Sequence, residues 1–249
     1  MLEGGMGDFL QFIPFCQANR HNFKYVCITH LKGAKGLFDG VGIDLKKLYL
    51  YGDDKEKAAI VSGLPQSVQY LRCSRAQYFS GSPFKAEKLL FDNGKPVVGI
   101  HVNGSAYSLN TQKQFGMVLK AIPSALIKEL KSDSYNLIVF GLRYEIEIMG
   151  LNEGDNLKFV TNENPAISLA YVQQCNVVIA SDSGIKTMSS MLKIPTLVWL
   201  GDYQDIPRDK FFINPYVNDG VMIVFKYQNL DSQFNDGVKL SKEFLKTFL

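Results

Sequence analysis

Short apolar runs alternate with amphipathic stretches along the second half of the chain. The runs span residues 96–101, 136–140, 157–161, 176–180 and 196–200, and each carries almost only strand-forming residues. Nearly continuous apolar strands are typical of a parallel sheet that is covered on both faces. Strands that alternate with helices at this spacing indicate βαβ units. The second half therefore predicts a parallel α/β sheet.

Helical patterns fill the gaps between these runs. They predict helices over 111–131, 164–174 and 183–192, and an amphipathic helix over 238–249. Pro123 divides the first of these, because a proline inside a helix removes a hydrogen bond and clashes with the preceding turn. Asn164 followed by Pro165 is a helix start, since asparagine caps helices well and proline suits the first helical position.

The first half of the chain shows a weaker pattern of the same kind. It predicts helices over 9–18 and 53–64 and strands over 24–29, 47–51 and 69–73. A dense turn signal over 92–96, Asp-Asn-Gly-Lys-Pro, separates this half from the strands that follow. We therefore expect two α/β domains, 1–93 and 94–249.

Composition narrows the class of protein. The chain has 249 residues, of which 46% are hydrophobic and 20% charged, as in an ordinary globular protein. A net charge of +3 suits phosphorylated substrates or an anionic membrane surface but gives no sign of nucleic-acid binding. No apolar run reaches the length of about 18 residues that a transmembrane helix needs, and the first residues lack the features of a signal peptide. We expect a cytoplasmic protein.

The cysteines and histidines favour neither disulfides nor a metal site. Cys16, Cys27, Cys73 and Cys175 are far apart and none forms a C-x-x-C pair, so we expect reduced, buried thiols. With only three histidines in the sequence, a structural zinc site is not expected.

The tetrapeptide Ser181-Asp182-Ser183-Gly184 (SDSG) stands where an apolar strand gives way to a helix. In an open parallel sheet, ligands bind beyond the carboxyl ends of the strands. The free N–H groups of the following helix and its positive dipole end favour a phosphate there, and Gly184 lets the backbone approach it. The alternative is plain helix capping by Ser181 or Asp182.

Three motifs, in order along the chain, carry a family resemblance. They are GGMGDFLQFIP at 4–14, VGIHVNGS at 98–105 and NVVIASDSGIKTMSSMLKIPTLVWLGD at 176–202. Together they resemble glycosyltransferase family 9, the ADP-heptose:lipopolysaccharide heptosyltransferases. The resemblance implies a GT-B fold, with two Rossmann-like domains facing a cleft and the N-terminal domain reduced.

The resemblance also implies an activity. The enzyme would move a heptose-like sugar from a nucleoside-diphosphate donor, ADP-heptose in the best-known members, to a glycan or lipopolysaccharide-type acceptor at the inner membrane. The transfer would be inverting and independent of a metal or other cofactor. The family's catalytic base falls on Asp8, which would deprotonate the acceptor hydroxyl. Asp8 also fits an N-cap of the following helix, and both roles can coexist.

Protein groups must stabilise the leaving diphosphate in such a reaction. The expected donor-binding residues are Asn103, Gly104, Ser105, Lys113, Gly141, Glu145, Ser181, Asp182, Ser183, Gly184, Lys186 and Thr187. For Lys113 and Lys186, a solvated surface charge is the alternative.

The sequence departs from the family at several points. Only residues 1–3 precede Gly4, where the family has a complete strand, and Thr187 stands where the family usually has histidine. The N-terminal domain is short. A nucleotide- or sugar-binding protein without transferase activity, or another GT-B enzyme such as a sugar epimerase, therefore stays open. The last helix, 238–249, either crosses back onto the N-terminal domain or docks on its own.

Overall fold

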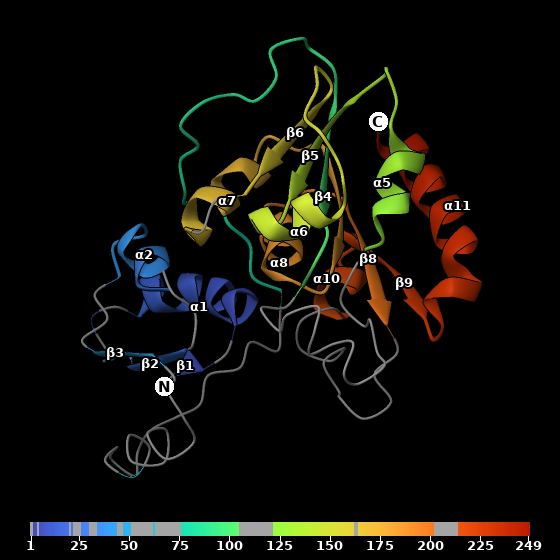
Figure 1. Cartoon of the computed structure of the whole chain (residues 1–249). Coiled ribbons are helices and arrows are strands. Elements are labelled where there is room, and N and C mark those ends of the chain that lie inside the picture. Colours follow the sequence, from blue (N-terminus) through green and yellow to red (C-terminus); the bar gives the residue numbers. More distant parts are fainter. Residues whose placement is uncertain are drawn as a thin grey trace.

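The computed structural model describes residues 2–3, 5–19, 21, 26–29, 34–43, 47–50, 62, 76–104, 122–161, 164–201 and 214–249. Within these residues the chain forms two parallel sheets, one of three strands and one of six, with helices between and around them (Figure 1).

The larger sheet is entirely parallel, as the apolar runs predict. Its strands are β4 (Val97–His101), β5 (Asn136–Phe140), β6 (Leu157–Val160), β7 (Val177–Ser181), β8 (Thr196–Gly201) and β9 (Met222–Tyr227). They lie in the order β6-β5-β4-β7-β8-β9. Counted from β4, this is the 3-2-1-4-5-6 order of a doubly wound nucleotide-binding sheet. The strand order reverses between β4 and β7, and ligands of such sheets bind at that switch point.

Helices cover both faces of the larger sheet. They are α5 (Ser124–Leu130), α6 (Arg143–Ile148), α7 (Pro165–Val172), α8 (Gly184–Met191), α10 (Asn214–Asn218) and α11 (Leu230–Phe248). Buried residues of α7 and α8 belong to the core on one face, and those of α5 and α11 to the core on the other.

The smaller sheet is built from the first part of the chain. It contains β1 (Leu2–Glu3), β2 (Val26–Thr29) and β3 (Lys47–Leu50), all parallel and in that order. Two helices, α1 (Met6–Ala18) and α2 (Ala34–Asp39), belong to the same unit. The strand before Gly4 is thus present, although it is only two residues long.

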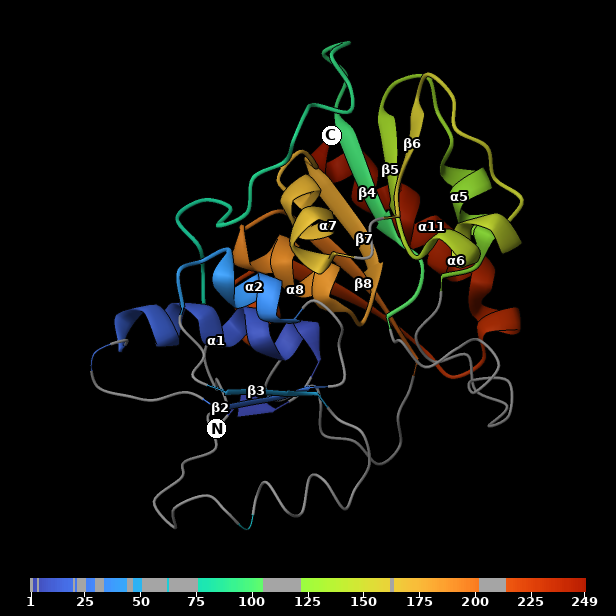
Figure 2. The same ribbon diagram turned by 60° about the vertical axis from the view of Figure 1, so that its left-hand side comes forward.

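Helices α1 and α2 pack between the two sheets, against α7 and α8 (Figure 2). The buried side chains of Phe9 and Phe38 meet edge to face, with ring centroids 5.7 Å apart. They lie in one continuous core with Leu169 of α7 and Met188 of α8. The two units therefore share a core at this seam.

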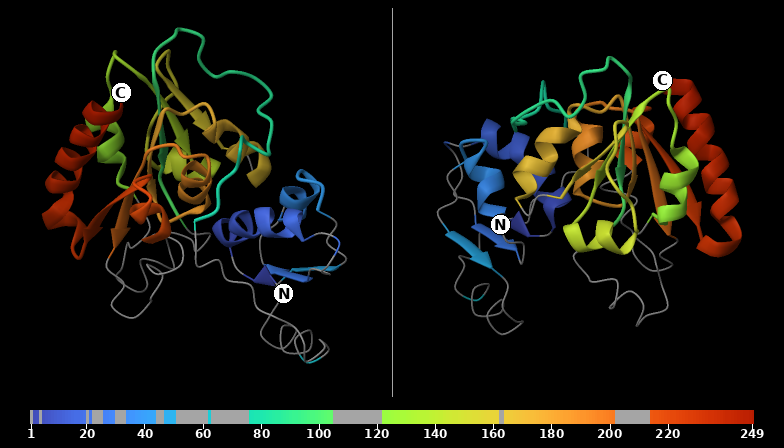
Figure 3. Two further views of the ribbon diagram at one scale, coloured as in Figure 1. Left: turned by 180° about the vertical axis from the view of Figure 1, so that it is seen from behind. Right: turned by 45° about the horizontal axis from the view of Figure 1, so that its top comes forward.

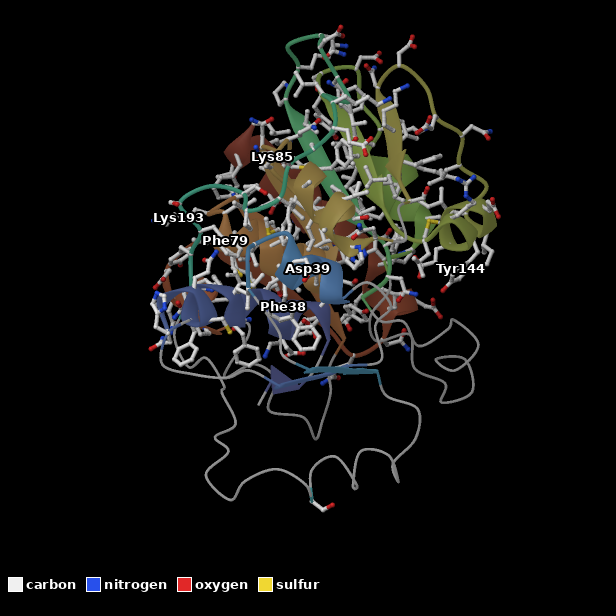
Figure 4. The ribbon with its side chains drawn as sticks, turned by 90° about the vertical axis from the view of Figure 1, so that its left-hand side faces the viewer. Phe38, Asp39, Phe79, Lys85, Tyr144 and Lys193 are labelled. Carbon is white, nitrogen blue, oxygen red and sulfur yellow. The ribbon has the colours of Figure 1, made fainter. Side chains whose placement is uncertain are left out.

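The segment that precedes β4 lies on the larger unit. The backbone N–H of Phe79 donates to the Met191 carbonyl at the end of α8 (2.8 Å). Gln174 accepts from the Leu90 N–H (3.0 Å) and donates to the Lys88 carbonyl (2.8 Å). Figure 4 shows Phe79 close to Lys193, just beyond α8. The division of the chain at 93/94 stays a prediction.

Most predicted elements in the described residues are confirmed. Asn164 caps α7, accepting from the Ala166 N–H at 3.0 Å, and α5 begins directly after Pro123. Cys16 and Cys175 are buried free thiols. The predicted helix over 53–64 (apart from residue 62), the strand over 69–73 and the first part of the 111–131 helix lie outside the described residues.

Other elements differ from the prediction. The sequence reading missed α2, α6, α10 and β9, and it placed the start of α1 three residues late, at Phe9 rather than Met6. The last helix begins at Leu230 rather than 238. It packs on β7, β8, β9 and α5, on the side of the sheet away from α1 (Figure 3). Among the described residues, the docked arrangement is therefore the one observed. None of the described helices has the length and apolarity that a membrane span requires.

Candidate functional site

The loops after β4 and β7 touch backbone to backbone at the switch point of the larger sheet. A Cβ atom built on Gly104 would overlap the carbonyl oxygen of Asp182 and lie 2.9 Å from the Ser181 Oγ. Only glycine leaves room for this approach. The fold thereby brings the Asn103-Gly104 turn against the SDSG loop, as the sequence motifs imply.

Helix α8 opens from the SDSG loop with a cap on Ser183. The Ser183 Oγ accepts a hydrogen bond from the Lys186 N–H at 3.2 Å, and the Thr187 hydroxyl donates to the Ser183 carbonyl at 3.2 Å. The expectation that Ser181 or Asp182 caps the helix is wrong, because Ser181 still belongs to β7 and pairs with Trp199 of β8, and the N-cap position is taken by Ser183.

Lys186 is buried and paired rather than solvated. Its Nζ lies 2.9 Å from Asp182 Oδ1, and the two side chains are 2% and 12% exposed. The pair spans four residues, so it bridges the SDSG loop and the first turn of α8. A lysine at this end opposes the helix dipole, and the Asp182 carboxylate offsets that cost. The surface-charge alternative for Lys186 is therefore wrong.

Ser181 presents an unused polar atom at the same place. Its side chain is fully buried, and its Oγ has no hydrogen-bond partner among the described residues. A buried hydroxyl left unpaired costs about 1–3 kcal/mol, so a ligand or water that hydrogen-bonds to it would recover that energy. At the end of the neighbouring β4, burial lowers the pKa of His101 to about 4, which leaves the imidazole neutral at pH 7.

A buried carboxylate marks the end of β5, next to β4. Glu145, 4% exposed, accepts from the Asn103 side-chain amide (2.8 Å) and from the Leu142 N–H (2.6 Å). A Cβ on Gly141 would lie 3.0 Å from Val102 and 3.2 Å from Glu145 Oε2, so this turn is tight too. Desolvation raises the pKa of Glu145. In doubly wound sheets an acidic residue at the end of the second strand receives the ribose hydroxyls, and β5 is that strand here.

The predicted base, Asp8, sits in the first turn of α1. Its Oδ2 accepts from the Gly5 N–H at 2.7 Å, so Asp8 helps to cap α1 from the third helical position, whereas the N-cap itself is Gly5 and not Asp8. Helix α1 lies directly on α8, because a Cβ on Gly7 would be 2.8 Å from the Thr187 hydroxyl oxygen. The amino ends of the two helices therefore meet.

Met6 covers the first residue of α8. A Cβ on Gly184 would lie 2.9 Å from the Met6 Cγ and 3.2 Å from its Cβ. Ser183, Gly184 and Thr187 are buried, whereas Gly104 is partly exposed. Among the described residues, the SDSG loop is thus more accessible from the side of Gly104 than from the side of α1.

The structure brings most of the predicted site residues together. Asn103, Gly104, Ser181, Asp182, Ser183, Gly184, Lys186 and Thr187 lie at the switch point, Gly141 and Glu145 lie at the next strand end, and Asp8 belongs to the helix packed on α8. Ser105 and Lys113 lie outside the described residues. In the described part of the chain, no cluster of three histidine, cysteine, aspartate or glutamate side chains could hold a metal ion.

Sequence reasoning missed the packing of Met6 and Gly7 on α8, and it gave no role to Tyr144, which precedes Glu145 in the first turn of α6. Gly7, the last glycine of GGMGD, was a sign of close helix packing, although nothing in the sequence says which helix it contacts. Tyr144 had no motif of its own, and its position follows only from the turn that Glu145 caps.

Comparison with known proteins supports the fold. No protein-family model and no curated protein matches the chain. Among solved structures, it is similar to a glycosyl transferase family 9 protein from Veillonella parvula DSM 2008, with a TM-score of 0.59 and 12% identity over 99% of this chain and 95% of the other. A second is the spinosyn rhamnosyltransferase SpnG complexed with thymidine diphosphate, with a TM-score of 0.40, 16% identity and coverage of 87% and 63%. The first similarity confirms the predicted α/β, GT-B-like fold class.

Proposed function

We propose that this protein is a glycosyltransferase that takes its sugar from a nucleoside-diphosphate donor. The observation that carries the proposal is the meeting of α1 and α8. The contact of Gly7 with Thr187 holds the turn that contains Asp8 against the helix that opens from the SDSG loop. Asp8, the candidate base, and the SDSG loop, the candidate phosphate site, thus lie close together although they are far apart in the sequence.

The donor diphosphate would lie at the switch point between β4 and β7. The amino end of α8 and the backbone at Gly104 supply hydrogen-bond donors there. Lys186 supplies a positive charge that Asp182 holds in place until a diphosphate arrives. The ribose would face the Glu145 carboxylate at the end of β5, held by Asn103.

Asp8 would act as the general base. Its carboxylate takes the proton from the acceptor hydroxyl, whose oxygen attacks the anomeric carbon. The bond from that carbon to the diphosphate oxygen breaks, and the nucleoside diphosphate leaves with the bonding electrons. Such base assistance is typically worth about 10²–10⁴-fold in rate. Attack opposite the leaving group inverts the anomeric centre, and protein donors rather than a metal stabilise the leaving charge.

The finer assignment follows the family resemblance. It makes the transferred sugar heptose-like and ADP-heptose the first donor to test. The acceptor would be a glycan of the lipopolysaccharide type, met in the cytoplasm at the surface of the inner membrane. A net charge of +3 is compatible with that surface.

One observation favours a second candidate, a nucleotide- or sugar-binding protein without turnover. Met6 covers Gly184, and the neutral Thr187 packs against α1 at the position where the family usually has histidine. A chain that retains the donor site but not the catalytic arrangement would show these features. A different GT-B enzyme, such as a sugar epimerase, would differ in its products.

A thermal-shift screen against ADP, UDP, GDP, CDP and their sugar conjugates tests the donor site. A nucleotide at 100 times its Kd stabilises the fold by about 2.7 kcal/mol, or roughly 5–10 °C in a chain of this size. The shift should disappear in Ser183→Ala. The matched control is Asn229→Ala, which removes the cap of α11, where Asn229 accepts from the Ser232 N–H at 3.1 Å; α11 covers the other face of the larger sheet from α8. Both variants lose helix capping, so only the nucleotide-induced shift distinguishes them.

The Asp8→Asn variant separates the two candidate functions. The amide oxygen can still accept from the Gly5 N–H, so the turn should keep its cap. A transferase should retain donor binding in this variant and lose product formation with the donor that gives the shift. Product formation at the wild-type rate would remove Asp8 from the mechanism, and no product even in the wild type would favour the binding protein.

A further inference from the structure

An exposed tyrosine borders the candidate nucleotide site. Tyr144 stands in the first turn of α6, immediately before the buried Glu145, and its side chain is 42% exposed. Figure 4 shows it on the outer side of α6. Among the described residues no other aromatic ring contacts it, whereas Phe248, also exposed, packs its ring 4.9 Å from that of Phe244.

Apart from its hydrogen bond with the Glu145 side chain, Tyr144 belongs to neither hydrophobic core. Tyr171, Tyr216 and Tyr227 are all at most 7% exposed and belong to the cores. Tyr144 instead leaves much of its ring in solvent beside a carboxylate. That neighbourhood raises the pKa of Tyr144, through partial burial first and the Glu145 charge second. The phenol is therefore held next to Glu145 and stays protonated at neutral pH.

The direction of a bound nucleotide follows from the strand order. A diphosphate at the β4–β7 switch point and a ribose at Glu145 place the nucleoside across the ends of β4 and β5. The base then continues outward past Glu145, over the first turn of α6. Tyr144 is the aromatic side chain that this turn presents, next to the partly exposed Leu142.

We propose that Tyr144 forms the face on which the nucleobase of the donor stacks. This inference rests on the proposed nucleotide site and names the residue that binds its nucleoside half. Every base has a π-face, so stacking contributes affinity without a strict choice of base. Selectivity for one nucleobase would then come from other contacts. Tyr144 would strengthen the binding of both purine and pyrimidine nucleotides, and of purines more strongly because their rings are larger.

The test is calorimetric titration of the intact chain with the nucleoside diphosphate that gives the largest thermal shift, and separately with inorganic pyrophosphate. Tyr144→Phe keeps the ring and should bind the nucleotide within about twofold of the wild type. Tyr144→Ala should weaken nucleotide binding by about tenfold or more, because the stacking face is lost. Its affinity for pyrophosphate, which has no base, should not change.

Ile148→Ala is the matched control, since Ile148 lies one turn further along α6 and is 70% exposed. It should bind both ligands as the wild type does. If Tyr144→Ala binds the nucleotide like the wild type, or loses pyrophosphate to the same extent, the stacking role is overturned while the nucleotide site stands. If the wild type binds pyrophosphate and no nucleotide, the proposed donor function itself fails.

Discussion

Replacing Gly104 by alanine should separate the two loops that form the candidate site. The added Cβ would overlap the Asp182 carbonyl oxygen and lie 2.9 Å from both the Asp182 carbonyl carbon and the Ser181 Oγ. Ser181 can rotate its hydroxyl away, but the Asp182 backbone cannot. Ordinary contact between these atoms requires roughly 1 Å of additional separation between the loops. Gly104 is not in the left-handed region, so the cost is steric rather than torsional.

The size of the effect follows from this rigidity. Overpacking a tight site usually costs about 1–3 kcal/mol, and a clash with backbone belongs at the upper end. A loss of about 3 kcal/mol corresponds to roughly 6–12 °C in Tm for a chain of this length. The nucleotide-induced thermal shift should disappear as well, because the distance between the β4 loop and SDSG has changed.

Differential scanning fluorimetry and urea unfolding of Gly104→Ala measure this directly. Gly154→Ala is the control, since a Cβ there meets nothing within 4 Å and its backbone is not left-handed. That variant should keep the wild-type free energy of unfolding or gain a few tenths of a kcal/mol. If Gly104→Ala melts within about 2 °C of Gly154→Ala, the close contact of the two loops is refuted.

Three further variants test other parts of the structure. Lys186→Met leaves Asp182 without its ammonium partner at 2.9 Å and should lower the free energy of unfolding by about 3 kcal/mol. The double variant Asp182→Asn/Lys186→Met should recover most of this loss in a double-mutant cycle measured by urea unfolding. Strictly additive effects of the two substitutions would contradict the pairing. Gly237→Ala places a Cβ in overlap with the Trp199 ring, 2.6 Å from its Cζ2, and should cost about 2 kcal/mol. The emission of this sole tryptophan should change, so unchanged emission would count against the contact. Burial lowers the pKa of His101 from 6.5 to about 4, so as the pH falls the imidazole is protonated in the unfolded chain before it is protonated in the folded chain. The contribution of the neutral imidazole to the free energy of unfolding is therefore complete above pH 6.5 and is lost as the pH falls towards 4. Between pH 7 and 5 this loss is about 2 kcal/mol, and His101→Gln should lack it; identical pH slopes for the two proteins would argue against a buried neutral imidazole.

The core of the fold was readable from the sequence where burial leaves a clear pattern. Strands such as β5 and β7 are buried along their whole length, so they appear as uninterrupted apolar runs. The edge strand β9 is buried only at parts of its length, and its charged Lys226 obscures the run. The six-residue helices α2 and α6 are too short to show a helical period, and Gly36 lies inside the first of them.

The candidate site was readable only in part. Its motifs gave the Asn103-Gly104 turn and the SDSG loop, because both follow predicted strands of one sheet. The spacing of Asp182 and Lys186, four residues apart at a helix start, was a usable sign of their ion pair. The contact between Gly7 and α8 could not be predicted, since it depends on how two distant helices dock.

The small residue at position 187 and the close docking of α1 are physically linked. Thr187 fits against Gly7 because both side chains are small, and its hydroxyl donates to the Ser183 carbonyl within α8. An imidazole at the same position would need the space that α1 occupies and would push the turn carrying Asp8 away from the SDSG loop. The small side chain of Thr187 therefore keeps Asp8, the candidate base, close to the SDSG loop, the candidate phosphate site. In the proposed reaction, Lys186 is the described candidate for the positive charge that a leaving diphosphate needs, and its ammonium already lies beside Asp182.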